Sequence, residues 1–96
     1  MLDNEECQAV DVVTPDHLHF EPVMECLEAG KHVQCEKPLS LSIDEAEAMV
    51  AKAEEMGVEL AIDYNRRFAP GYVKAREWFD AGECGNLAYI DMKLSQ

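Results

Sequence analysis

Short apolar runs alternate with amphipathic stretches along this chain, and that alternation limits the possible folds more than any single residue does. Residues 9–14, 32–35 and 58–63 have the length and composition of strands, and stretches of helical length lie between them. Gly30 and Gly57 stand where each helix is expected to end. Strand, helix, strand, helix, strand at these intervals predicts right-handed crossovers and a parallel sheet.

The ends and faces of these elements also follow from the sequence. The nearly continuous apolar run 9–14 is typical of a strand covered on both faces, and Pro15 ends it. The first helix is expected to begin at about residue 19, because Pro22 is tolerated only in a first turn. Ser42 followed by Glu45 predicts a capping box at the start of the second helix. One apolar face is expected on that helix, formed by Ile43, Ala46, Met49, Val50 and Ala53.

The last third of the chain differs in character. A third helix is expected from about Pro70 to Gly82, and residues 87–94 alternate apolar and polar side chains as a half-exposed strand does. A change of character around residues 66–70 marks the only candidate domain boundary. We therefore divide the chain into residues 1–68 and residues 69–96.

Charge and composition exclude several classes of partner. Eight Lys and Arg against 20 Asp and Glu give a net charge of −12, which opposes binding to nucleic acid or to an anionic membrane. No apolar stretch approaches the roughly 20 residues that span a bilayer, and residues 3–6 are acidic where a signal peptide is basic. We expect a cytoplasmic protein.

The four cysteines predict neither a disulfide framework nor a metal site. Cys7, Cys26, Cys35 and Cys84 form no CxxC pair, and their wide spacing favours free thiols in a reducing compartment. Histidines occur near two of them, but no close set of four ligands is visible. We expect no bound metal.

Lys37 is the residue that most directly suggests chemistry. It follows the second expected strand within Glu36-Lys37-Pro38, and ligands of open α/β folds bind outside the carboxyl ends of parallel strands. There an amine can accept a proton from a hydroxyl or, when charged, stabilise an alkoxide. The alternative is a solvated lysine that pairs with Glu36.

Four motifs in order resemble one oxidoreductase family. They are residues 11–19 (DVVTPDHLH), 27–39 (LEAGKHVQCEKPL), 65–70 (NRRFAP) and 82–85 (GECG). Together they resemble the glucose-fructose oxidoreductase and inositol dehydrogenase family (Gfo/Idh/MocA). Members join an amino-terminal Rossmann domain, which binds NAD or NADP, to a domain built on an open antiparallel sheet, and they transfer hydride to or from sugars, inositols and related polyols.

The resemblance also implies roles for individual residues. Lys37 matches the catalytic lysine, which reaches the substrate hydroxyl and the nicotinamide. The residues that match segments lying along the cofactor or leading out of its domain include Lys37 again: Thr14, Pro15, His19, Glu36, Lys37, Pro38 and Arg67. The residues alone leave it open whether Arg66 and Arg67 bind an anion or pair with surface acids.

The glycines indicate that only part of a Rossmann fold is present. Five occur, at 30, 57, 71, 82 and 85, and no two stand in the G-x-G relation of a phosphate-binding turn. We therefore expect an α/β fold that is the second half of a doubly wound Rossmann-like sheet, followed by the first helix and strand of an α+β substrate domain.

Two functions are consistent with this partial fold. The first is a fragment of an NAD(P)-dependent oxidoreductase of polyols, inactive alone. The second is a non-catalytic half-Rossmann scaffold or interaction module. In either case the first strand is expected to expose an unpaired edge, which predicts a homodimer or higher assembly through strand edges.

Overall fold

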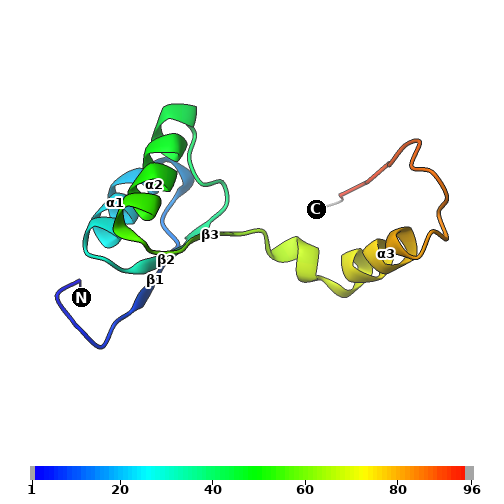
Figure 1. Cartoon of the computed structure of the whole chain (residues 1–96). Coiled ribbons are helices and arrows are strands. Elements are labelled where there is room, and N and C mark those ends of the chain that lie inside the picture. The colour runs from blue at the N-terminus through cyan, green and yellow to red at the C-terminus, as the bar shows by residue number, and fades with distance from the viewer. Residues whose placement is uncertain (1, 95–96) are drawn as a thin grey trace. The chain divides into compact units, whose positions relative to one another are not determined.

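Three strands lie side by side in parallel, in the order β1 (Ala9–Val12), β2 (His32–Glu36) and β3 (Leu60–Asp63) (Figure 1). Val12 is the register partner of Cys35, and Cys35 is the register partner of Ile62. All three strands therefore end at the same edge of the sheet. The computed structural model describes residues 2–94 and confirms the parallel sheet expected from the alternating pattern.

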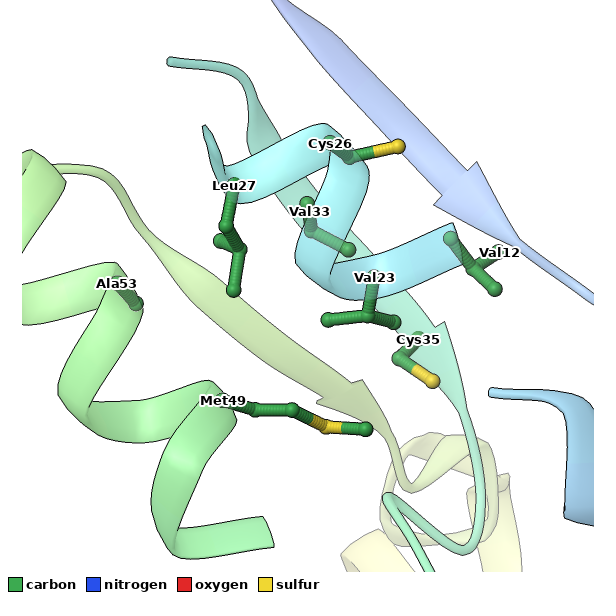
Figure 2. Packing of buried hydrophobic residues seen from close by; sticks show 8 residues of the cluster. All are labelled: Val12, Val23, Cys26, Leu27, Val33, Cys35, Met49 and Ala53. Carbon is green, nitrogen blue, oxygen red and sulfur yellow. The ribbon is translucent and has the colours of Figure 1, made fainter. Parts of the chain in front are cut away.

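Helices α1 (Phe20–Glu28) and α2 (Ile43–Met56) both cover one face of this sheet (Figure 1). Their buried side chains meet those of β1 and β2 in a single core, shown in Figure 2. The core consists of Val12, Val23, Cys26, Leu27, Val33, Cys35, Met49 and Ala53.

The other face of the sheet is open among the described residues. Asp11, Gln34 and Ala61 lie in register on that face and are exposed. The expectation that the first strand is covered on both faces is therefore wrong for residues 2–94. The reason is geometric: two right-handed crossovers that step in the same direction place both helices on the same side.

Helix α2 buries only part of its predicted apolar face. Met49 and Ala53 are in the core, whereas Ile43 is 78% exposed and Val50 is 47% exposed. The apolar arc of α2 is wider than the surface that α1 and the sheet offer it. An apolar strip thus remains open on α2.

Residues 65–94 belong to a second compact unit, whose contacts are mainly internal, as are those of the first unit, Met1–Tyr64. It contains α3 (Pro70–Asp80), which begins at the predicted proline. Residues 87–94 do not form the predicted strand. A strand needs a neighbour to receive its backbone hydrogen bonds, and no strand lies within residues 65–94.

Candidate functional site

The residues that sequence analysis singled out in the first unit gather at the carboxyl edge of the sheet. Thr14 and Pro15 follow β1, and Lys37 and Pro38 follow β2. The peptide bond between Lys37 and Pro38 is cis. Glu36 is half-buried, and Lys37 is exposed. The lysine amine is therefore accessible at the strand ends, where parallel sheets bind ligands.

Asp63 joins this edge from β3 and was not among the predicted site residues. It is the register partner of Glu36, so the two carboxylates stand on neighbouring strands and on the same face. Asp63 is the final residue of the third apolar run, which is the signal that sequence reasoning overlooked.

His19 connects the segments that follow β1 and β2. Its side chain is 1% exposed. Ring atom Nδ1 lies 2.6 Å from the carbonyl oxygen of Pro38, and Nε2 lies 2.9 Å from the carbonyl oxygen of Thr14. His19 therefore brings Thr14 and Pro38 to the two sides of one ring, although 24 positions separate them in the sequence (38 − 14 = 24).

The turn after β1 is also closed by local hydrogen bonds. The Thr14 hydroxyl donates to the carbonyl of Leu18 at 3.1 Å, and the Leu18 amide donates to the carbonyl of Pro15 at 2.8 Å. These bonds fold residues Asp16–Leu18 into a short 3-10 turn (η1). The turn is thus formed before α1 begins.

The segment after β2 is anchored on α2 by Ser40. Its hydroxyl donates to the Glu45 carboxylate at 2.5 Å and accepts from the Ser42 amide at 3.1 Å. The predicted capping box pairs Ser42 with Glu45 and leaves out Ser40, whose only signal in the sequence is its place two residues before the N-cap. Lys37 therefore lies on a short loop that is held on both sides.

Cys35 lies beneath this edge, in the core. Burial, together with the nearby carboxylates of Glu36 and Asp11, raises the pKa of its thiol from 9.0 to about 11. Burial and the Glu25 carboxylate also raise the pKa of Cys26. Both thiols stay protonated at neutral pH, which makes them poor nucleophiles.

Arg67 lies in the second unit, on the 3-10 turn Asn65–Phe68 (η2), and is exposed. The other predicted site residues lie in the first unit.

Among residues 2–94, no cluster of three or more His, Cys, Asp or Glu side chains is arranged to bind a metal ion. In the same part of the chain, none of the helices has the length and apolar character needed to cross a bilayer.

The glycines do not form a phosphate cradle in the described chain. Gly30 and Gly57 have φ of 73° and 65° and follow the carboxyl ends of α1 and α2. A pyrophosphate site instead needs glycines that lead into the amino end of a helix. The glycines of the described residues thus do not suit the phosphates of a nucleotide.

Three parallel strands that are joined by helices and end at one edge define part of an open α/β domain, and ligands of such domains bind at that edge. Residues 1–64 match the family described as the oxidoreductase family with an NAD-binding Rossmann fold (GFO_IDH_MocA). The chain belongs to that family, as its four motifs led us to expect.

The alignments with similar proteins cover most of this chain. The NAD⁺-dependent scyllo-inositol 2-dehydrogenase of Bacillus subtilis is 38% identical over 89 residues, which are 93% of this chain and 26% of the relative. The NADP⁺-dependent scyllo-inositol 2-dehydrogenase of the same organism is 37% identical over 80 residues, covering 83% of this chain and 22% of that enzyme. The structure of apo scyllo-inositol dehydrogenase from Lactobacillus casei has a TM-score of 0.80 and 30% identity, over 90% of this chain and 26% of that one. The chain therefore spans about a quarter of the length of these relatives.

Proposed function

We propose that this chain supplies the second half of the dinucleotide-binding domain of an NAD(P)-dependent oxidoreductase that acts on a sugar, inositol or related polyol. The observation that carries the proposal is the common carboxyl edge of the three strands, with exposed Lys37 on a loop held by His19 and Ser40. The scyllo-inositol dehydrogenases similar to the chain support a polyol substrate.

The chain's own residues would act on the proton of the reaction. In its uncharged form the Lys37 amine accepts the proton of the substrate hydroxyl as the carbon–oxygen double bond forms. In the reverse direction the charged amine returns that proton. Glu36 would lie beside the nicotinamide and its ribose. A bound NAD or NADP would supply the hydride acceptor for that carbon.

The proposal assigns the other residues to binding the cofactor. Thr14, Pro15, His19 and Pro38 form the wall along the dinucleotide, and Arg67 belongs to the segment that leaves the cofactor domain. Residues 1–68 form the partial Rossmann domain, and residues 69–96 begin the substrate and oligomerisation domain. The chain is inactive alone, because no G-x-G pair stands among its glycines to hold the phosphates.

Similarity over this quarter of the relatives does not choose between NAD and NADP. Two relatives with 38% and 37% identity are named for different dinucleotides. The acidic residue that selects NAD in Rossmann folds follows the glycine-rich turn by about 20 positions. This chain has no glycine-rich turn from which to count those positions, so its motifs do not identify the selecting residue.

A chimera tests the proposed chemistry. The matching segment of the NAD⁺-dependent scyllo-inositol 2-dehydrogenase is replaced by residues of this chain, and NAD⁺-dependent oxidation of scyllo-inositol is measured. We expect the chimera to be active and Lys37→Ala to lower kcat about 10²- to 10⁴-fold, the usual contribution of a general base. An active chimera with unchanged kcat after Lys37→Ala would refute the role of this lysine.

Lys52→Ala is the matched control in that assay. Lys52 lies near the carboxyl end of α2 and pairs with Glu55 at 2.9 Å. A helix between parallel strands runs opposite to them, so its carboxyl end lies away from the catalytic edge. We expect this variant to keep the kcat of the chimera.

The second candidate is a non-catalytic scaffold or interaction module that assembles through strand edges. The outer edges of β1 and β3 pair with no further strand among residues 2–94, which is what assembly through strand edges needs. Sedimentation of the chain tests the assembly: a homodimer or larger species supports it, and a monodisperse monomer refutes it. Titration of the chain with NADH helps to separate the two functions: saturable binding supports a residual cofactor site, whereas an absence of binding fits either a scaffold or an incomplete enzyme.

A further inference from the structure

The His19 ring is placed between two backbone carbonyls that belong to different loops. Nδ1 is 2.6 Å from the Pro38 oxygen, and Nε2 is 2.9 Å from the Thr14 oxygen, both within hydrogen-bond distance. Carbonyl oxygens only accept hydrogen bonds, so each of these contacts is a hydrogen bond when the ring nitrogen carries a hydrogen. A ring that donates on both sides carries a hydrogen on each nitrogen.

His32 makes the opposite arrangement in the same chain. Its Nδ1 accepts a hydrogen bond from the Glu59 amide at 3.0 Å. A nitrogen that accepts has no hydrogen, so His32 can carry its hydrogen only on Nε2. The partners of the two histidines thus differ: two carbonyl oxygens contact the His19 ring, and one amide N–H contacts the His32 ring.

The loop with Lys37 has two anchors, and His19 is the one on the side of β1. Pro38 is held by the His19 ring, and Ser40 is held by the Glu45 carboxylate of α2. Of these, only the His19 ring also contacts Thr14, in the turn after β1. Loss of the ring would release Pro38 from Thr14 while leaving the Ser40 anchor in place.

We propose that His19 is a positioning residue: by donating from both ring nitrogens, it ties the turn after β1 to Glu36-Lys37-Pro38, so that the two segments hold a fixed separation. The role of this separation in catalysis rests on the proposed function, because it matters only if the edge binds a dinucleotide and a polyol. The tie itself is a property of the chain without any ligand.

NMR of the ¹⁵N-labelled 96-residue chain tests the tie in the absence of ligand. Long-range ¹H–¹⁵N spectra report which ring nitrogens carry a hydrogen. We expect hydrogens on both nitrogens of His19 and on Nε2 alone of His32. A single hydrogen on His19 would overturn the proposal, because one of its two contacts would then not be a hydrogen bond.

Substitution of His19 tests the mechanical consequence. His19→Gln keeps a polar side chain but cannot place donors on two sides of a ring, and we expect the backbone order parameters of Lys37 and Leu39 to fall from about 0.85 to below about 0.6. The amides of Thr14 and Asp16 should shift as well, while Val33 and Ile62 in the strands stay unchanged. Shifts confined to one of the two loops, or rigid amides at Lys37 and Leu39, would overturn the proposal.

His17→Gln is the matched control, because His17 is exposed on the same turn. We expect the order parameters of Lys37 and Leu39 to stay unchanged in this variant, because the tie to Pro38 is kept. If His19→Gln does not fold, the ring hydrogens of the unmodified chain still decide the proposal. The assay of Lys37→Ala in the chimera does not involve His19, so a failure of the proposed function is distinguished from a failure of this one.

Discussion

The Ser40 hydroxyl lies 2.5 Å from the Glu45 carboxylate, which the capping-box pattern had assigned to the Ser42 amide. The Ser42 amide instead donates to Ser40 Oγ at 3.1 Å. The other half of the capping box forms as predicted, since Ser42 Oγ accepts from the Glu45 amide at 3.5 Å. Ser40 thus enters between the two residues and links the loop after β2 to the start of α2.

This arrangement predicts a modest loss of stability on removal of the cap. Ser42→Ala leaves one amide of the first turn of α2 unpaired, which typically costs about 1 kcal/mol. Ser42→Asp retains an oxygen that accepts from the Glu45 amide and is expected to keep most of that stability. Urea unfolding followed by circular dichroism measures both. Equal unfolding midpoints for Ser42→Ala and the unmodified chain would contradict the cap.

Leu27 is the largest fully buried apolar side chain of the first unit and is expected to carry much of its stability. Leu27→Ala removes three heavy-atom groups from the core between α1 and β2 and should cost about 3 kcal/mol. Leu41→Ala is the comparison, because Leu41 is exposed and its replacement should change stability by less than about 0.5 kcal/mol. Urea unfolding measures the free energy of unfolding of the two variants. Similar losses of stability would show that Leu27 does not lie in the core.

The raised pKa of Cys35 predicts how stability depends on pH. The unfolded thiol loses its proton near pH 9.0, whereas the folded thiol keeps it until about pH 11. Below pH 9.0 both states hold the proton, so this site adds no pH dependence. Between 9.0 and about 11 only the folded state holds it, so the free energy of unfolding falls as pH rises.

Cys35→Ala isolates this contribution from lysine and tyrosine titration. Urea midpoints are compared at about pH 8 and about pH 10. We expect the midpoint of the unmodified chain to fall further between the two conditions than that of Cys35→Ala. Equal falls would show that the Cys35 thiol titrates at its ordinary value in the folded chain.

The parts of the fold that follow from local pattern were predictable, and those that depend on a neighbour were not. The runs around Val12, Cys35 and Ile62 have strand character in any context, and their parallel pairing follows from the helices between them. Residues 87–94 have the alternation of a strand but no partner strand within residues 65–94. The apolar face of α2 was recognised, but exposure of Ile43 depends on what else packs there.

The site divides in the same way. The position of Lys37 after a strand is local information and was read correctly from the sequence, while its role as a catalytic amine stays a prediction. The place of His19 between the Thr14 and Pro38 carbonyls joins two loops from different strands, and no spacing in the sequence reveals it. Asp63 became visible only when the register paired it with Glu36.

The most direct test of the central claim, that the Lys37 amine moves the substrate proton, is chemical rescue in the chimera. A small primary amine such as methylamine is added to the Lys37→Ala chimera, and kcat for scyllo-inositol oxidation is followed against amine concentration. We expect kcat to rise and saturate with added amine, and the Lys52→Ala chimera to show no response. A Lys37→Ala chimera as fast as its parent without added amine would contradict the account.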